Sequence, residues 1–443
     1  MRHPCASVAV PSYAPSVPIY QPYTRRDLGR IQQLRRLPAA ARQEMEVVAR
    51  VLPFRASNFV IEELIDWRKA PDDPYFRLMF PVRDMLRPAH YERMAAALKR
   101  GSSVEVDAVA KAIRSELNPH PAGQLERNVP VLKDSPLPGM QHKYPETVLF
   151  FPTQGQTCHA YCSFCFRWAQ FIGDGNLRIA AREGAILADY LRVHPEVSDV
   201  LFTGGDPLVM KTQTLATYID RLLAADIDHL SSIRIGTKAL TFWPHRFLTD
   251  PDADDLLRLF ERVVKAGKHL AFMAHFNHPR AVSHPMVQRA IARIRETGAE
   301  IRTQSPLLAH INDDPGIWSE MWREQVKSGC IPYYMFVVRD TGAQHYFGVP
   351  LSRAHEIFQG AYQQVSGLAR TVRGPSLSTA QGKLQVMGVN EIEGERVFTL
   401  QFIQARQPEW VLQPFFARYD PEARWLDELR PAFGEERFFF DQP

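Results

Sequence analysis

The stretch Glu146–Trp168, ETVLFFPTQGQTCHAYCSFCFRW, joins a short apolar run to a loop that contains three of the chain's five cysteines. An apolar run of this length, rich in β-branched and aromatic residues, is typical of a buried strand. Cys158, Cys162 and Cys165 follow the run in a C-x3-C-x2-C pattern. We therefore expect this loop to carry the chemistry of the protein, directly after the first strand of the main fold.

Five further apolar runs follow along the chain, and helical patterns separate them. The runs begin at Val197, Ser231, His269, Ala299 and Pro332. The helical patterns include residues 181–194, 215–225, 254–267 and 284–298. Strands that alternate with helices indicate right-handed βαβ units and a parallel sheet. Six units at a spacing of roughly 30 residues predict an α/β fold, a partial (β/α)6 barrel of the TIM type.

The regions on either side of these units differ from them. Residues 1–145 combine helical spacing, as in 38–52 and 91–101, with irregular stretches broken by prolines. No chemical motif stands out there, so we expect a mostly helical packing or assembly domain. Residues 146–345 hold the predicted barrel. Residues 346–443 mix short strands with helix and predict an α+β closing segment.

The composition excludes several classes of protein. The 443 residues are 45% apolar and 23% charged, as in an ordinary globular protein. With 53 basic and 49 acidic residues, the net charge of +4 argues for neither nucleic acid nor an anionic membrane as a partner. Five cysteines exclude a disulfide scaffold, and no run reaches the roughly 18 apolar residues of a membrane span. Four prolines interrupt the first twenty residues, so we expect no secretory signal and a cytoplasmic location.

The three clustered cysteines suit an iron–sulfur site. Three thiolates on one tight loop can hold three irons of a 4Fe–4S cubane and leave the fourth iron open to a small chelating ligand. The alternatives are spare thiols or a zinc site, because His159 lies between the cysteines and zinc prefers four ligands. The other two cysteines, Cys5 and Cys330, are isolated. Cys330 precedes an apolar run and is expected to be a buried small hydrophobe.

The cysteine pattern, with the aromatic Phe164 before the last cysteine, resembles that of the radical S-adenosylmethionine (SAM) enzymes. In that family the open iron chelates the amino and carboxylate groups of SAM. Reduction then splits SAM into methionine and a 5′-deoxyadenosyl radical. The motif TGGDPL, which supplies Gly204, Gly205 and Asp206, is similar to the edge with which the family holds the methionine amino group.

The resemblance is closer to the lysine 2,3-aminomutase branch and runs from about 130 to 390. It comprises eight stretches in one order: DSPLPGMQHKYPETVLF, the cluster loop continuing CFRW, TGGDPL, IRIGTK, AHFNHP, TQSPLL, PYYMF and GKLQVM. The resemblance implies that five polar residues at strand ends line the SAM pocket, namely Thr237, Lys238, His275, Gln304 and Ser305. The alternative for each is a polar side chain whose hydrogen bonds a neighbouring loop satisfies.

Aminomutases of this branch bind pyridoxal phosphate (PLP) through a lysine. The resemblance places that lysine at Lys383, although Gly382 is all that remains of the family's glycine run; the alternative is a solvated lysine on a loop. For the phosphate, the family presents two arginines around a Tyr-Pro pair. This chain has Lys143, Tyr144 and then Thr147, so it presents one cation at this place. A phosphate dianion favours more than one charged donor. The sequence therefore leaves PLP open.

Arg167 stands where the family grips the substrate carboxylate, a task that suits a bidentate guanidinium. The lysine enzyme also uses two aspartates that recognise the distant ammonium of its substrate. Alignment on PYY places Arg339 at the first of these positions, beside Asp340, and Arg373 or Ser376 at the second. Two cations there would repel a lysine side chain and would suit an acidic or neutral one.

These features predict a radical SAM isomerase of the amino-acid 2,3-aminomutase type, whose 5′-deoxyadenosyl radical takes a hydrogen from the substrate β-carbon. Arg167 and Lys383 are the expected catalytic residues. The implied partners are a small amino acid and a reductant such as flavodoxin or ferredoxin, and a homo-oligomer is left open. Two alternatives remain: a radical SAM enzyme without PLP that acts on a small molecule or peptide, and a non-enzymatic iron–sulfur or zinc protein.

Overall fold

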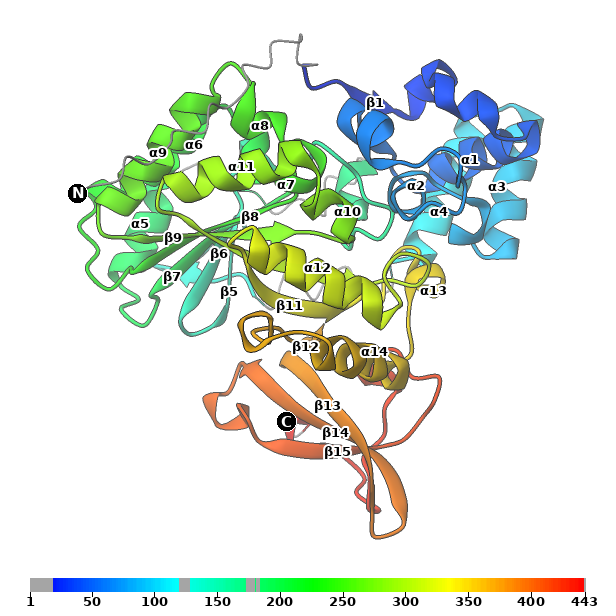
Figure 1. Ribbon diagram of the computed structural model, residues 1–443. Coiled ribbons are helices and arrows are strands. Elements are labelled where there is room, and N and C mark those ends of the chain that lie inside the picture. Colours follow the sequence, from blue (N-terminus) through cyan, green and yellow to red (C-terminus); the bar gives the residue numbers. More distant parts are fainter. Residues whose placement is uncertain (1–18, 119–127, 173–179, 181–183, 442–443) are drawn as a thin grey trace, which may run out of the picture.

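The computed structural model describes residues 19–118, 128–172, 180 and 184–441, and an eleven-stranded sheet forms its centre (Figure 1). The strands follow one another in the order β15-β14-β13-β12-β11-β10-β9-β8-β7-β6-β5. The strands from β6 to β12 run parallel. They are β6 (Thr147–Phe150), β7 (Asp199–Phe202), β8 (Ser232–Thr237), β9 (His269–His275), β10 (Glu300–Leu307), β11 (Ile331–Val337) and β12 (Arg373–Ser378).

Helices connect each parallel strand to the next. The longer ones are α5 (Gly184–Arg192), α6 (Thr212–Ala224), α9 (Ala253–Lys265), α11 (Pro285–Glu296), α12 (Pro315–Lys327) and α14 (Leu351–Gln363). Short helices lie among them: α7 (Ala239–Phe242), α8 (His245–Leu248), α10 (Pro279–Val282) and α13 (Gln344–Phe347). The six expected strands and their helices are all present, so the partial (β/α)6 barrel is confirmed.

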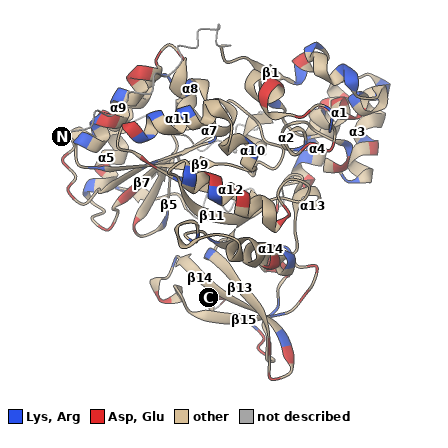
Figure 2. Ribbon diagram, viewed as in Figure 1, with Lys and Arg blue, Asp and Glu red and all other residues tan. Residues whose placement is uncertain are grey.

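Each helix buries one apolar face against the sheet. In α9, Leu256, Leu259, Phe260 and Val263 are buried at the spacing of one helical face. Phe260 packs edge-on against Phe272 of β9, with ring centroids 5.0 Å apart. Charged residues gather on the solvent side of the helices, whereas the strands are mostly uncharged (Figure 2). Charges that do occur on the strands therefore call for an explanation.

Two antiparallel extensions complete the sheet. β5 (Met140–Tyr144) pairs with β6 at one edge. At the other edge lie β13 (Gly382–Ile392), β14 (Glu395–Ala405) and β15 (Pro414–Arg418). The two edges touch, because Lys143 donates to the carbonyl of Thr379 and Arg406 donates to Asn128 Oδ1. We call this contact the seam; it brings the end of the chain against the first strands of the barrel.

The region before the barrel is mainly helical. It contains α1 (Ala39–Val51), α2 (Pro74–Met79), α3 (Pro88–Arg100) and α4 (Ser103–Glu116), and short paired strands β1 (Pro22–Thr24) with β2 (Arg55–Ser57) and β3 (Val131–Leu132) with β4 (Ser135–Pro136). Its buried apolar residues belong to the same hydrophobic core as those of the barrel. Among the described residues, no helix has both the length and the apolar character that a membrane crossing needs.

Candidate active site

The three clustered cysteines lie on the loop after β6, which we call the cluster loop (residues 152–168). Cys158 and Cys162 are buried and Cys165 is half-buried. Burial raises the pKa of Cys158 and of Cys162, and the neighbouring thiols raise each of them further. Lys238, at the end of β8, interacts electrostatically with all three. The thiols thus face one small region, and this donor set fits the three protein ligands of a 4Fe–4S cluster.

The helical region before the barrel holds the cluster loop in place. Arg55 donates from Nη1 to the carbonyl of Cys158 at 2.7 Å, and its own carbonyl accepts from the backbone N–H of Tyr161 at 2.9 Å. Ser163 donates from its hydroxyl and from its backbone N–H to the carbonyl of Leu78, at 2.7 and 2.9 Å. This region contains no chemical motif, yet it positions the loop through backbone contacts that sequence reasoning missed.

Asp206 links the cluster loop to two strand ends. Its buried carboxylate accepts hydrogen bonds from the backbone N–H of Leu208 at 3.0 Å and of Lys238 at 2.8 Å. It also accepts from the hydroxyl of Thr237 at 2.8 Å and lies 3.1 Å from Nε2 of His159. A carboxylate offers about four lone-pair positions, so these contacts satisfy it. Asp206 and Thr237 therefore act as supports for the loop.

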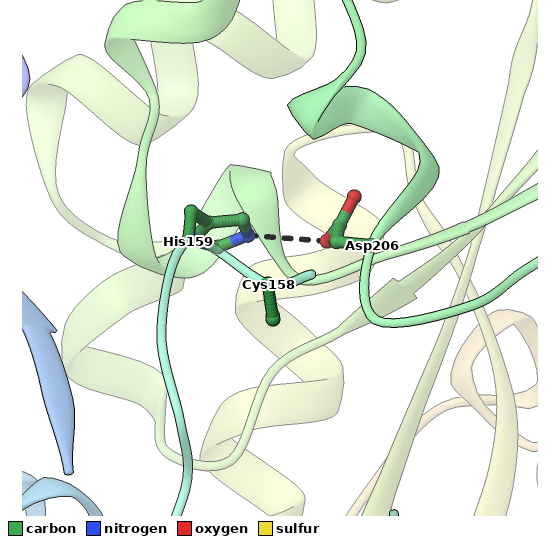
Figure 3. Close-up of side chains that lie close together, drawn as sticks. All are labelled: Cys158, His159 and Asp206. Carbon is green, nitrogen blue, oxygen red and sulfur yellow. Dashed lines mark hydrogen bonds and ion pairs between the residues drawn. The ribbon is translucent and has the colours of Figure 1, made fainter. Parts of the chain in front are cut away.

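Cys158, His159 and Asp206 also present donor atoms that lie within 4.8 Å of one another. This trio is the form that the zinc alternative would take. The side chains of His159 and Asp206 point toward one another, and Cys158 lies beside them (Figure 3). Because the Asp206 carboxylate is already saturated by the protein, we interpret the trio as a link within the fold. Cys330 is buried as expected, and Cys5 lies outside the described residues.

The glycine pair after β7 permits a very close backbone contact. A Cβ atom at Gly205 would lie 2.0 Å from the carbonyl oxygen of Thr157, and one at Gly204 would lie 2.5 Å from that of Gly155. The segment after β7 donates to the cluster loop here, since Gly205 N–H donates to the Gly155 carbonyl at 3.0 Å. The close approach is therefore made by the cluster loop itself, and side chains at either glycine would push the loop away.

The remaining residues predicted for the SAM pocket occupy two faces of the sheet. Lys238 Nζ lies 3.3 Å from Cys162 Sγ and 4.5 Å from the centroid of the Phe164 ring. Burial lowers the pKa of Lys238, but the three cysteines outweigh that effect and raise it. His275 Nε2 lies 2.8 Å from Gln304 Nε2. Burial, aided by Lys238, lowers the pKa of His275 well below its usual value.

Ser305 lies apart from Gln304, because adjacent residues of a strand point to opposite faces. Its buried hydroxyl accepts from Asn277 Nδ2 at 2.9 Å and donates to the carbonyl of Pro306 at 3.1 Å. These are the contacts of a polar residue satisfied by its neighbours. The structure thus brings Gln304 to His275 and places Ser305 on the other side of β10.

Lys383 is a residue of strand β13 and not of a loop, contrary to the alternative of a solvated loop lysine. Its amine lies 4.0 Å from the ring centroid of Tyr334, and the side chain is half-buried. Burial, reinforced by the cations Arg234, Arg373 and Lys143, lowers its pKa to about 7. The pairing of β13 with β12 places this lysine within the sheet.

The seam supplies a second cation beside Lys143. Burial, together with the charges of Arg406 and Arg339, lowers the pKa of Lys143 to about 7. The amine donates to the carbonyl of Thr379. Arg406 follows β14 and is distant from Lys143 in sequence, so no local motif could reveal it. The expectation of a single cation here is therefore corrected: the fold brings an arginine from the far end of the chain.

Two arginines lie close to the Phe166 ring. The guanidinium carbons of Arg167 and Arg339 lie 5.5 and 5.3 Å from its centroid. Burial and the charge of Arg339, opposed by Cys165, lower the pKa of Arg167 to about 10. Burial also lowers the pKa of Arg339, against Asp340. Arg167 Nη1 and Arg339 Nε are sealed from solvent, with no hydrogen-bond partner in the described parts of the chain.

Arg373 belongs to a different part of the site. Its guanidinium carbon lies 4.4 Å from the ring centroid of Tyr333 and 4.9 Å from that of Tyr334. Tyr334 is also the ring beneath Lys383. The structure therefore separates the three residues predicted for the substrate end: Arg339 and Asp340 lie by Arg167, whereas Arg373 lies by Lys383.

Comparison with known proteins places this geometry in a family. No protein-family model matches the chain. A protein of Aquifex aeolicus named "Putative L-lysine 2,3-aminomutase" is 31% identical over 400 residues, which cover 90% of this chain and 93% of the relative. L-lysine 2,3-aminomutase of Clostridium subterminale is 32% identical over 236 residues, 53% of each chain.

Among solved structures, a radical SAM methyltransferase from Sphaerobacter thermophilus matches 54% of this chain and 68% of its own, with 16% identity and a TM-score of 0.36. A likeness this weak supports no conclusion about activity. The near full-length match to the Aquifex protein, in contrast, extends over the helical region, the barrel and the closing strands. The chain belongs to the lysine 2,3-aminomutase family of radical SAM enzymes.

Proposed function

We propose that this chain is an amino-acid 2,3-aminomutase, an isomerase that moves the amino group of its substrate from the α- to the β-carbon. Membership in the radical SAM enzymes implies a 4Fe–4S cluster, bound SAM and a reductant. The observation that carries the proposal is the convergence of three cysteine thiols on one loop with a lysine from a neighbouring strand end. Cysteines 158, 162 and 165 are the proposed cluster ligands.

The surrounding residues would prepare this site. With SAM on its open iron and one electron from a reductant, the cluster supplies a 5′-deoxyadenosyl radical, which takes a hydrogen atom from the substrate. Lys238 places a positive charge beside the thiols, which favours their anionic form. Asp206 fixes the distance between the loop and β8. Gln304 and His275 hold one another in orientation at the neighbouring strand ends.

We further propose that PLP binds at the seam, with Lys383 as its covalent anchor. Bound PLP supplies an aldehyde that takes up the migrating nitrogen. A lysine with a pKa near 7 is partly neutral at physiological pH, as a nucleophile must be. Lys143, Arg406 and Arg373 provide cations for a phosphate. The ring of Tyr334 forms an apolar surface beneath the amine.

Anaerobic reconstitution with iron, sulfide and PLP tests both proposals. We expect 5′-deoxyadenosine and a β-amino acid when SAM, a reductant and the correct amino acid are present, both detected by mass spectrometry. We also expect a visible absorbance band of lysine-bound PLP that Lys383→Ala abolishes and that the exposed control Lys265→Ala retains. Production of 5′-deoxyadenosine without that band would favour the alternative of a radical SAM enzyme that does not use PLP.

A further inference from the structure

The pair Arg167 and Arg339 bears on the charge of the substrate, which membership in the family does not define. Both guanidiniums lie close to the ring of Phe166, a side chain that is 41% exposed, and they interact with one another electrostatically. Arg167 also lies over Phe151, with 4.4 Å from its guanidinium carbon to the ring centroid. Aromatic faces hold a guanidinium in plane and leave its edge free to bind an anion.

The buried nitrogens of these arginines point to a missing ligand. Arg167 Nη1 and Arg339 Nε have neither solvent nor a protein acceptor within the described ranges. A buried charged donor without a partner destabilises the folded protein, so such a donor is retained where a ligand completes it. Two such donors, on two guanidiniums that share one ring, indicate a ligand with two acceptor groups.

The charge around this pair is positive. The positive charges of Arg167 and Arg339 disfavour a further cation at this place. Lys143 also interacts electrostatically with Arg339. Asp340 is the acidic residue that interacts with Arg339, and it has a further contact of its own within the protein. A substrate side chain that ends in an ammonium would therefore meet repulsion, whereas a carboxylate would be attracted.

We propose that the substrate is an acidic amino acid, whose two carboxylates bind to Arg167 and Arg339. This proposal rests on the proposed aminomutase function and adds the substrate class to it. Arg167 binds the carboxylate next to the amino group, since it adjoins the cluster loop. Arg339 binds the side-chain carboxylate. Because both guanidiniums lie close to the Phe166 ring and interact electrostatically, we expect one short molecule to reach both.

The test compares four amino acids on the reconstituted holoenzyme with SAM: L-glutamate, L-aspartate, L-glutamine and L-lysine. Calorimetric titration measures binding, and 5′-deoxyadenosine is measured separately. We expect one of the acidic amino acids to bind tightest and glutamine, the neutral isostere, to bind at least 10-fold more weakly. We expect Arg339→Gln to weaken binding of the acidic ligand by roughly 10- to 100-fold, the loss of one charge-assisted hydrogen-bonding group.

Two further variants sharpen the result. Arg339→Asp reverses the charge and should shift the preference toward L-lysine, which a merely structural role for Arg339 would not do. Arg353→Gln, an exposed residue on α14 that pairs with Glu356, should leave all affinities unchanged. The inference is overturned if lysine or glutamine binds to the unmodified protein as tightly as the acidic amino acids, or if Arg339→Gln leaves the affinity unchanged. Absence of 5′-deoxyadenosine with every amino acid would instead count against the proposed function.

Discussion

Replacement of Asp206 tests whether one buried carboxylate holds the cluster loop to the barrel. In Asp206→Ala, the backbone N–H groups of Leu208 and Lys238 and the hydroxyl of Thr237 lose their acceptor in a buried site. An unsatisfied buried donor costs about 1–3 kcal/mol. After partial relaxation we expect a loss of roughly 4 kcal/mol in the free energy of unfolding. Asp206→Asn retains one acceptor oxygen and should lose about half as much.

The matched control is Asp314→Ala, which removes an exposed carboxylate that caps α12 by accepting from two backbone N–H groups, those of Gly316 and Ile317. An exposed cap is worth about 1 kcal/mol. Anaerobic urea denaturation, followed by tryptophan fluorescence, gives the midpoint of unfolding for each variant. Iron content after reconstitution shows whether the cluster loop can still take up iron. The reasoning is refuted if Asp206→Ala is no less stable than Asp314→Ala and still takes up a full complement of iron.

Four further substitutions follow from the same geometry. Gly205→Ala should abolish iron incorporation because its Cβ would lie 2.0 Å from a backbone carbonyl oxygen. The control Gly29→Ala, at a position with open space around it, should leave the iron content unchanged. Equal iron content in the two variants would contradict this prediction. Lys143 and Lys383 have pKa values lowered to about 7, so the unfolded chain binds more protons above that pH and stability should rise from pH 7 to about 10. The slope of stability against pH, at most about 1.4 kcal/mol per pH unit for each lysine, should flatten in thermal scans of Lys143→Met and Lys383→Met. Arg55→Met should lower iron retention under mild chelation, because it removes the donor to the Cys158 carbonyl. Circular dichroism should show unchanged secondary structure. Unchanged iron retention would show that the cluster loop does not need this hydrogen bond.

The strands of the barrel were predictable because their pattern is local. Each apolar run between polar strand ends proved to be a strand, from β6 to β11. That the three cysteines, Asp206 and Lys238 come together was expected, since the polar residues that follow parallel strands gather at one end of a barrel, while their roles stay predictions. The role of Asp206 was less accessible, because its partners lie on the loop after one strand and at the end of another.

Contacts between distant segments could not be predicted. Arg55 meets the cluster loop about a hundred residues later in the chain, and Arg406 meets Lys143 across the seam. Neither arginine belongs to a pattern, so only the packing of the helical region and of the closing strands reveals it. Lys383 is a related case: the sequence left open a solvated lysine on a loop, and only the pairing of β13 with β12 shows that it belongs to a strand.

The central claim is that three cysteines hold a cluster that cleaves SAM. Its most direct test is 5′-deoxyadenosine formation by the anaerobically reconstituted protein with SAM and dithionite, in parallel with iron and sulfide content. We predict about four irons per chain and SAM cleavage that are both lost on Cys158→Ala, Cys162→Ala or Cys165→Ala and retained on Cys330→Ala, a buried cysteine outside the loop. Full iron content and cleavage in any of the three loop variants, or none of either in the unmodified protein, would contradict the account.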